Sequence, residues 1–335
     1  MKQIQLKNVP EQFALPTENT FELCSVPVPN IAQGECLVKV LALSVAPVQL
    51  RFLTNTSVAS NAISIGDYIP GRGVGIVIKS KSSRFSVGDF IQGPCGWREY
   101  ATIQENNPLA ITMNCKDLPI RFGVSTLGIT GMSALIGLNK IAKITKKDTV
   151  VISGVLGGVG SQVAQIARIK KCKKVIGICG STLKCELAKK RLNIDEAINY
   201  NDPDFLIKLE QAVGNGVDIF FDNVGGEILD NVLLYINRKA RIVACGGISQ
   251  YLLDDKNKYQ YKNIWKMQLH DALYQSFMIY DYVKHFYHMH SILAEYVREY
   301  KITPLEDISY GLESITHAIN DLYLRKNIGA RIVVL

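Results

Sequence analysis

The sequence predicts an α/β protein of two domains, one built on a doubly wound parallel sheet and the other rich in β-strands. Its length of 335 residues exceeds what one ordinary core needs. The first third reads as short strands broken by glycine turns. From about residue 128, strand-like apolar runs alternate with helical patterns. That alternation requires right-handed crossovers and therefore predicts a parallel sheet.

Composition and charge exclude several classes of protein. Hydrophobic residues make up 47% of the chain and charged residues 20%, and no apolar run reaches the roughly 18 residues of a membrane span, so no membrane association is expected. The N-terminal "MKQIQLKNVPEQ" lacks the apolar core of a secretion signal, which predicts a cytoplasmic protein. The 8 cysteines follow no metal-binding spacing and predict reduced, structural thiols. The net charge of +8 is spread along the chain, so nucleic acid is not expected as a partner.

The β-rich domain is expected to combine both ends of the chain. Residues 35–43, "ECLVKVLAL", alternate like a half-buried strand, and residues 71–93 read as short strands separated by glycine turns. The tail "NIGARIVVL" is again strand-like and is expected to return to this domain. We therefore predict one domain over 1–127 with 303–335 and a second over 128–302.

The second domain shows alternating strands and helices, ahead of a Tyr- and His-bearing helix near 282–300. The predicted elements are, in order, the strand "TVVIS" (149–153), a helix over 159–171, the strand "KVIGIC" (174–179), a helix over 182–191, the strand "VDIFFDNV" (217–224), a helix over 227–236, and the strands "ARIVACGG" (240–247) and "SFMIY" (276–280).

A glycine-rich turn between the first strand and helix of this domain predicts a dinucleotide site. Gly157, Gly158, Val159 and Gly160 open the helix after "TVVIS", and Gly154 precedes them. Glycines at such a turn let the backbone approach a pyrophosphate, and the helix N-terminus offers it N–H groups. The pattern departs from strict G-x-G-x-x-G because Val155 holds the first glycine's place. We therefore expect a Rossmann-type fold, against the alternative of a glycine turn that binds nothing.

The end of the second strand favours NADPH over NADH. An NAD-binding domain places a carboxylate there to bind the ribose, but residues 178–184 read "ICGSTLK" and hold none. Ser181 and Lys184 instead leave room and positive charge for a 2′-phosphate. The alternative for Lys184 is an ordinary solvated lysine.

No metal site is expected. No histidine precedes His270, so the first domain cannot supply the Cys, His and carboxylate set of a catalytic zinc, and zinc-dependent alcohol oxidation is disfavoured. His285, His288 and His290 lie close in sequence, but no carboxylate is interleaved. An aromatic-rich amphipathic helix explains them better than metal ligation.

Over nearly the whole chain, an ordered set of motifs resembles the zinc-independent medium-chain dehydrogenase/reductase superfamily, and most closely its alkenal/prostaglandin reductase branch. The motifs are "GITGMSAL" (128–135), the glycine turn, "CGST.K" (179–184), "INY" (198–200), "FDNVGGE" (221–227), "CGGISQY" (245–251) and "NIGARIVV" (327–334). The resemblance implies a GroES-like β-rich domain and an NADPH-dependent reductase of conjugated double bonds. The glycine turn also resembles the quinone oxidoreductase branch.

The resemblance also implies roles for particular residues. It places Lys184 and Tyr200 at the 2′-phosphate end of the cofactor, Asn223 near the nicotinamide, and Tyr251 beside the substrate. The other cofactor contacts that it implies are Cys245, Gly246, Gly247 and Ile248, then Phe277, Met278 and Ile279, and the C-terminal Asn327. The family's "S-V-D-P-Y-M-R" segment reads "SVAPVQLR" here, which changes the substrate pocket, and Ala330 replaces a customary lysine.

The implied chemistry needs a proton donor. When hydride reaches the β-carbon of an enal or enone, negative charge collects on the carbonyl oxygen. Tyrosine ordinarily keeps its proton at neutral pH, so Tyr251 is the candidate catalytic residue, alongside the cofactor ribose hydroxyl. Residues 252–265 follow a strand's carboxyl end and are interpreted either as a mobile cover or as an ordinary surface loop.

Three functions are open at this point. The first is an enal/enone reductase, and the second a quinone reductase with the same cofactor. The third is a non-catalytic NADPH-binding protein, crystallin-like or nucleic-acid-associated. The family further implies a homodimer, formed by edge pairing of the strand "SFMIY".

Overall fold

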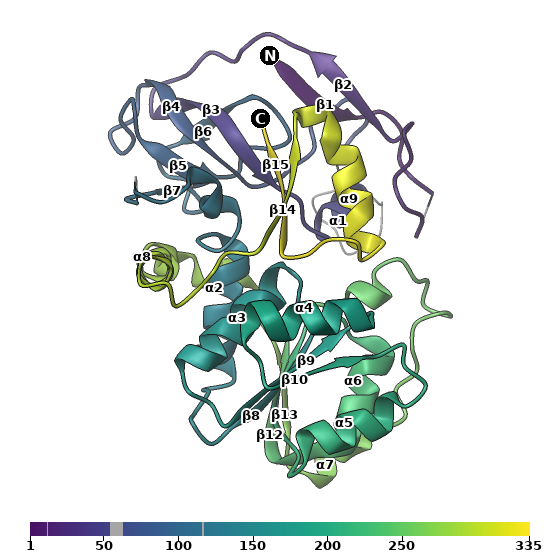
Figure 1. Ribbon diagram of the computed structural model, residues 1–335. Helices are drawn as coiled ribbons and strands as arrows, with labels where there is room; N and C mark the ends of the chain where they lie inside the picture. The colour runs from purple at the N-terminus through teal and green to yellow at the C-terminus, as the bar shows by residue number, and fades with distance from the viewer. Residues whose placement is uncertain (12, 54–62, 116) are drawn as a thin grey trace. The chain divides into compact units, whose positions relative to one another are not determined.

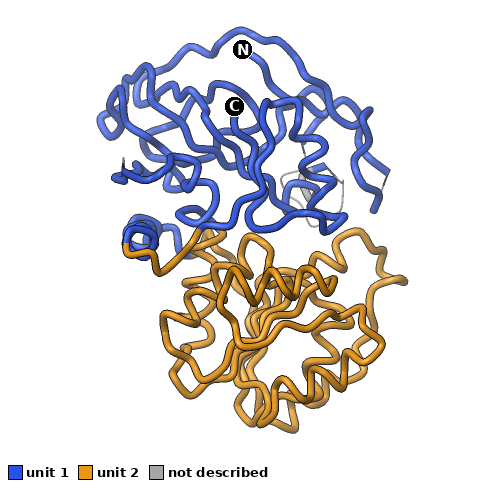
Figure 2. Tube along the Cα trace, in the orientation of Figure 1, with its two compact units in different colours: residues 1–129, 282–298, 304–335 blue, residues 130–281, 299–303 orange. Residues whose placement is uncertain are grey.

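The computed structural model describes every residue except 12, 54–62 and 116. The chain forms two compact units (Figure 2). Unit 1 comprises residues 1–129, 282–298 and 304–335, and unit 2 comprises residues 130–281 and 299–303. None of the helices in the described residues is long and apolar enough to cross a membrane.

A parallel six-stranded sheet forms the centre of unit 2 (Figure 1). Its strand order is β10-β9-β8-β11-β12-β13, and every neighbouring pair is parallel. The strands are β8 (Thr149–Ser153), β9 (Lys174–Cys179), β10 (Glu196–Asn199), β11 (Val217–Asp222), β12 (Ile236–Ala244) and β13 (Leu273–Ser276). The chain builds outward from β8 to β10 and then restarts on the other side with β11. This order confirms the doubly wound Rossmann-type sheet and creates a crevice at the carboxyl ends of β8 and β11.

Helices cover both faces of this sheet because its strands are apolar on both faces. Phe220 joins the core cluster that includes the buried residues of α5 and α6. The adjacent Phe221 points the other way, so close to Gly137 that a Cβ there would lie 2.3 Å from its ring. The helices are α2 (Ile129–Ile136), a π-helix (Gly137–Ile141), α3 (Gly158–Ile169), α4 (Thr182–Leu192), α5 (Phe205–Val213), α6 (Gly226–Val232) and α7 (Trp265–Leu269), with 3-10 turns at Leu233–Tyr235 and Ile248–Gln250.

The last strand lies earlier than the sequence predicted. β13 covers Leu273–Ser276, paired in register with β12 from Arg241 to Ala244. Because β12 ends at Ala244, its pairing with β13 stops at Ser276, and the expected strand "SFMIY" is wrong. The chain instead turns into a 3-10 helix at Ile279–His285 before α8 (Phe286–Arg298).

Unit 1 is the β-rich part. Its main sheet has the order β14-β15-β3-β4-β5-β7. The strand β6 lies off this path and pairs antiparallel with the first half of β3. The tail returns to this unit as predicted, since β15 pairs antiparallel with β3. The strands are β1 (Lys2–Leu6), β2 (Phe21–Ser25), β3 (Glu35–Ser44), β4 (Gly73–Ser80), β5 (Phe90–Gly93), β6 (Tyr100–Gln104), β7 (Ile111–Thr112), β14 (Glu306–Tyr310) and β15 (Ala330–Val334). The helices are α1 (Gln49–Leu53), α8 and α9 (Ile315–Tyr323), with 3-10 turns at Ile120–Val124 and Leu312–Ser314.

Candidate functional site

The carboxyl ends of β8 and β11 are tied together by side chains at the switch point of the sheet. The Ser153 hydroxyl donates to Asp222 Oδ1 at 2.7 Å and accepts the Asn223 backbone N–H at 2.8 Å. The Asn223 side-chain amide donates to the Ser153 carbonyl at 2.8 Å. Asn223, predicted to lie near the nicotinamide, is therefore fixed in the crevice between the two halves of the sheet.

Asp222 organises the turns around this crevice. Its carboxylate is 1% exposed and accepts the backbone N–H groups of Val224 and Gly225, each at 3.0 Å. Its carbonyl oxygen accepts the N–H groups of Cys245 at 2.9 Å and Gly246 at 3.1 Å. Burial raises the pKa of Asp222, while the hydrogen bonds from Gly225, Ser153 and Val224 to its carboxylate oppose that rise. Sequence reasoning missed this residue, although an aspartate that ends an apolar strand was a usable signal.

A tight glycine turn lies in front of α3, where the phosphate cradle was predicted. Gly154 has a φ of +59°, which favours glycine. A Cβ at Gly160 would lie 2.3 Å from the Gly154 carbonyl oxygen, so the helix packs against the turn more closely than any side chain allows. Gly157 is the N-cap residue, and no side chain caps the helix. The first N–H groups of α3 are therefore suited to an anion.

The departure from the strict glycine motif has a structural cause. Val155, in the first glycine's place, is fully buried. A Cβ at Gly177 of β9 would lie 2.5 Å from a Val155 methyl carbon, so the absence of a side chain on β9 provides the space for that valine. The valine packs into the sheet and leaves the cradle backbone intact.

The predicted 2′-phosphate residues meet at the ends of β9 and β10. Ser181 caps α4 by accepting the Lys184 N–H at 3.2 Å, which places Lys184 in the first turn. The Tyr200 N–H donates to the carbonyl of Cys179 at 3.0 Å. A Cβ at Gly180 would lie 3.2 Å from the Tyr200 hydroxyl, so that ring covers the glycine. Asn201, which sequence reasoning missed, donates to the Gly180 carbonyl at 2.9 Å.

Tyr251 lies directly after the 3-10 turn Ile248–Gln250 at the carboxyl end of β12. Its hydroxyl accepts the Gly247 N–H at 3.1 Å. The N–H of Ile248 lies 3.5 Å from the Asn223 carbonyl. The backbone predicted to lie alongside the nicotinamide and the predicted catalytic phenol are therefore joined in one turn.

The remaining predicted cofactor contacts lie in different units. Phe277, Met278 and Ile279 follow β13, whose last residue Ser276 pairs with Ala244, the residue before the turn that starts at Cys245. Asn327 belongs to unit 1, where its side chain donates to the Gly329 carbonyl at 2.9 Å.

The segment 252–265 is anchored through one buried carboxylate. Asp230 of α6 is 1% exposed and accepts the N–H groups of Lys262 at 3.0 Å and Asn263 at 2.8 Å. It also accepts the Tyr259 hydroxyl at 3.0 Å, and burial together with Asp230 raises the pKa of Tyr259 to about 12. The Tyr261 hydroxyl accepts the Gly226 N–H at 3.2 Å.

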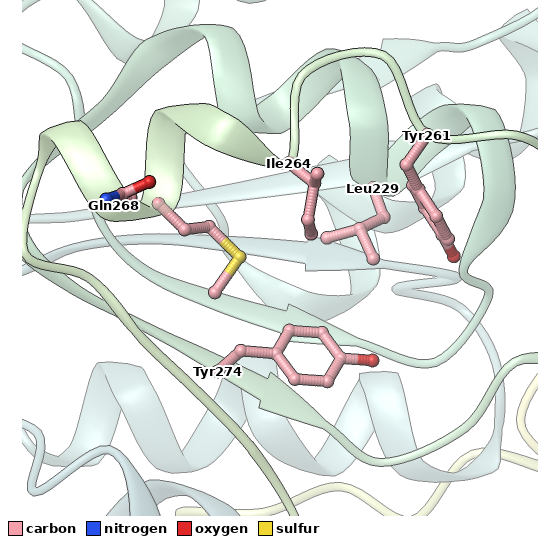
Figure 3. Close-up of a pocket in the computed structure, with 6 residues that line it drawn as sticks. Leu229, Tyr261, Ile264, Gln268 and Tyr274 are labelled. Carbon is pink, nitrogen blue, oxygen red and sulfur yellow. The ribbon is translucent and has the colours of Figure 1, made fainter.

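A mostly apolar pocket of about 510 Å³ lies beside this segment (Figure 3). It is lined by Leu229, Tyr261, Ile264, Met267, Gln268 and Tyr274. Within the described part of the chain, no group of three or more His, Cys, Asp or Glu side chains is placed to hold a metal ion. His285 and His288 are exposed, whereas His290 is buried.

Two family models match the chain. Residues 2–111 match the N-terminal domain of oxidoreductase, and residues 158–290 match a model described as zinc-binding dehydrogenase. The chain belongs to the medium-chain dehydrogenase/reductase superfamily, a superfamily of oxidoreductase enzymes.

Particular relatives narrow this class. An NADP-dependent 2-alkenal reductase of Nicotiana tabacum is 32% identical over 344 residues, covering 99% of this chain and 97% of the relative. The (+)-pulegone reductase of Mentha piperita is 34% identical over 314 residues, covering 91% of this chain and 89% of the relative. The crystal structure of CurA from Vibrio vulnificus in complex with NADPH is 30% identical, with a TM-score of 0.90 over 100% of this chain and 99% of that one.

Proposed function

We propose that this protein is an NADPH-dependent, metal-independent oxidoreductase that reduces the carbon–carbon double bond of α,β-unsaturated aldehydes and ketones by hydride transfer to the β-carbon. One observation carries the proposal: Asn223, the turn of residues 245–248 and Tyr251 converge on the switch-point crevice, beside the uncapped N-terminus of α3. The likeness to the alkenal and pulegone reductases supports it.

The residues present fit NADPH at both ends. The uncapped first turn of α3, with Gly157, Gly158, Val159 and Gly160, provides N–H groups to a pyrophosphate. Ser181 and Lys184 provide a hydroxyl and a positive charge to the 2′-phosphate, and Tyr200 lies over Gly180 beside them. Asn223 and residues 245–248 border the space for the nicotinamide, with Phe277, Met278 and Ile279 alongside.

In this reaction NADPH supplies the hydride, and the chain supplies orientation and charge stabilisation. Asp222 and Ser153 hold Asn223 and the 245–248 turn rigidly, which preserves the orientation of whatever binds there. The Tyr251 hydroxyl is held at that turn by the Gly247 N–H at 3.1 Å. We propose that it donates a hydrogen bond to the carbonyl oxygen on which negative charge develops, and that Asn327 is a further cofactor contact.

Consumption of NADPH by a panel of enals, enones and quinones tests this function. We expect turnover of enals and enones with NADPH, and a much higher KM for NADH, because no carboxylate lies at the end of β9 to bind an unphosphorylated ribose. Turnover of quinones alone would establish the quinone reductase instead. Absence of turnover with every acceptor, despite tight NADPH binding, would indicate a non-catalytic binding protein and contradict the proposal.

We further propose that unit 2 pairs with a second copy through the edge strand β13. Leu273 and Tyr274 on this strand are 47% and 46% exposed, and Trp265 and Leu269 of α7 are 52% and 66% exposed. An apolar edge strand is a template for pairing with another strand. The apolar pocket of about 510 Å³ shares Tyr274 with this edge (Figure 3).

Light scattering after size exclusion tests the dimer. We expect a dimer for the unaltered protein and a monomer for Leu273→Asp. Ile207→Asp provides the matched control, because Ile207 is a 57% exposed side chain on α5, which packs on β10 at the opposite edge of the sheet from β13. A monomeric unaltered protein at micromolar concentration would contradict this assembly.

We also propose that residues 1–127 with 303–335 form the substrate domain and that residues 128–302 form the cofactor domain. We propose further that the enzyme is cytoplasmic.

A further inference from the structure

Two cysteines flank the expected 2′-phosphate residues. Cys179 ends β9, and Cys185 lies in α4, with Ser181 and Lys184 between them in sequence. Neither thiol has a part in the proposed reaction. Both lie in unit 2, so their mutual position depends only on β9 and the helix packed on it.

The two side chains occupy the same layer between sheet and helix. Ile176 and Ile178 of β9 point into the core cluster on one face, so the alternation of the strand directs Cys179 to the opposite face. That face is the one that α4 covers, since a Cβ at Gly177 would meet Ile194 just beyond the helix. On α4, Cys185 begins the buried stripe that continues with Ala188 and Leu192.

The thiols are in hydrogen-bonding contact. The hydrogen bond with Cys185, together with burial, raises the pKa of Cys179, and the same bond lowers the pKa of Cys185. The charge of Lys189 also favours the Cys185 thiolate. The pair therefore combines a thiol that gives up its proton more readily with a neighbouring thiol that holds its proton more firmly, the two roles that a redox-active dithiol requires.

Cys185 is 8% exposed, and a groove leads to its side chain. The side chain lines a groove of about 410 Å³ along the edge strand β10, together with Thr182 and Asn199. Cys179 is 4% exposed and does not line this groove. The geometry thus separates an attacking cysteine from a resolving one.

We propose that Cys179 and Cys185 form a redox-active dithiol that closes to a disulfide on reaction with a low-molecular-weight disulfide, at the expected 2′-phosphate end of the cofactor site. The Cys185 thiolate attacks one sulfur of the small disulfide, forms a mixed disulfide and releases one thiol. Cys179 then loses its proton, attacks the Cys185 sulfur and releases the second thiol. The two cysteines are oxidised by two electrons, and the small disulfide is reduced to two thiols.

Closure of this disulfide is expected to weaken NADPH binding, a consequence that rests on the proposed function. A covalent link from β9 to α4 is expected to shift the first turn of the helix, where the Ser181 cap positions Ser181 and Lys184. NADH lacks the 2′-phosphate, so its affinity is expected to change much less.

Peptide mapping after treatment of the full-length protein with glutathione disulfide tests the covalent step. Trypsin cleaves after Lys184, so the proposed disulfide joins the peptide of residues 175–184 to that of residues 185–189. We expect this linked pair in the unaltered protein and in Cys172→Ser, a control at another buried cysteine of unit 2, and its absence in Cys185→Ser. Failure of the linked pair to form while Cys185 carries glutathione, or while it stays a free thiol, would overturn the proposal.

Calorimetric titration of both dinucleotides then tests the consequence. We expect oxidation to raise the Kd for NADPH by about ten-fold, reversibly with dithiothreitol, with the Kd for NADH nearly unchanged. An unchanged Kd for NADPH in fully linked protein would overturn the regulatory part. Reduced protein that binds neither dinucleotide would instead overturn the proposed function, and the linked peptides would still decide the covalent step.

Discussion

At the scale of single residues, the candidate site consists of a few side chains whose positions are fixed by backbone groups. Ser181 is held by the Lys184 N–H at 3.2 Å, and the Tyr251 hydroxyl by the Gly247 N–H at 3.1 Å. Such local hydrogen bonds pre-orient the groups that bind or react, so each role can be tested by one substitution.

Lys184→Ala is expected to raise the Kd for NADPH by about 10- to 100-fold and to leave the Kd for NADH nearly unchanged, because only the 2′-phosphate uses this charge. Fluorescence titration with both dinucleotides provides the measurement. Lys189→Ala is the matched control on the same helix, since Lys189 pairs with Glu196 at 3.2 Å. Equal losses for both dinucleotides would place Lys184 outside the phosphate site.

Tyr251→Phe is expected to lower kcat on enones by about ten-fold without abolishing turnover, because a ribose hydroxyl can also stabilise the developing charge. The KM for NADPH is expected to rise less than kcat falls. Steady-state kinetics on several enones provides the measurement. An unchanged kcat on every substrate would remove Tyr251 from the mechanism.

At the scale of elements, the positions of turns depend on buried carboxylates at the ends of strands and helices. Asp222 holds the turns after β11 and β12, and Asp230 of α6 holds residues 259–263. A buried carboxylate that accepts several N–H groups stabilises one loop conformation, and removal of it leaves those donors unsatisfied. The segment 252–265, interpreted as a cover or a surface loop, therefore depends on Asp230.

Asp230→Ala is expected to destabilise the protein by about 2–4 kcal/mol, since the Tyr259 hydroxyl, the backbone N–H groups of Lys262 and Asn263, and the Asn263 side-chain amide lose a carboxylate acceptor. Limited proteolysis is expected to cut the variant faster between residues 252 and 265 than elsewhere. Asp254→Ala is the control, because Asp254 lies within the segment itself and its carboxylate accepts the Asn257 N–H at 2.8 Å. Identical cleavage of the variant and the unaltered protein would show that Asp230 does not anchor the segment.

At the scale of the whole molecule, the chain returns to unit 1 with helix α8 and again with the C-terminal residues (Figure 2). Helix α8 brings His290 into unit 1, where the ring is 4% exposed. Its Nδ1 lies 3.2 Å from the Gln92 amide nitrogen and 3.3 Å from the Leu127 carbonyl, and its Nε2 lies 3.5 Å from the Cys115 sulfur. Arg298 on the same helix pairs with Asp117 at 2.7 Å.

The stability of the protein is expected to fall as the pH drops below 6.5, the ordinary pKa of histidine. Burial lowers the pKa of His290. The hydrogen bond with the Leu127 carbonyl opposes this shift, and the positive charge of Arg298 adds to it. At pH values between the pKa of His290 in the folded protein and its ordinary pKa, the unfolded chain binds more protons than the folded one. The contribution of His290 to the free energy of unfolding is therefore present at higher pH and lost on acidification.

Melting temperatures at about pH 7.5 and about pH 5.5 test this dependence. We expect a larger decrease on acidification for the unaltered protein than for His290→Gln, which keeps a polar side chain at the site but does not titrate. His288→Gln is the control, because His288 is exposed on the same helix. Equal decreases for the unaltered protein and His290→Gln would contradict the assignment.

Much of the fold could be predicted because short-range sequence patterns indicate its strands, helices and turns. Apolar runs such as "TVVIS" and "KVIGIC" and the glycine turn between strand and helix are short-range signals, and they predicted the parallel sheet and the cradle. The end of β13 could not be predicted from "SFMIY", since it depends on where the neighbouring β12 stops. Asp222 and Asp230 were missed because their importance comes from N–H groups of distant segments.

By itself, the sequence determined the class of fold, the glycine turn and the absence of a carboxylate at residues 178–184, because residue type and spacing along the chain set these features. Only the tertiary structure decided that Ser153, Asp222 and Cys245 meet at one crevice, that Gly177 accommodates Val155, and that Cys179 faces Cys185. These contacts join parts of the chain that register and packing bring together, and no local pattern encodes them.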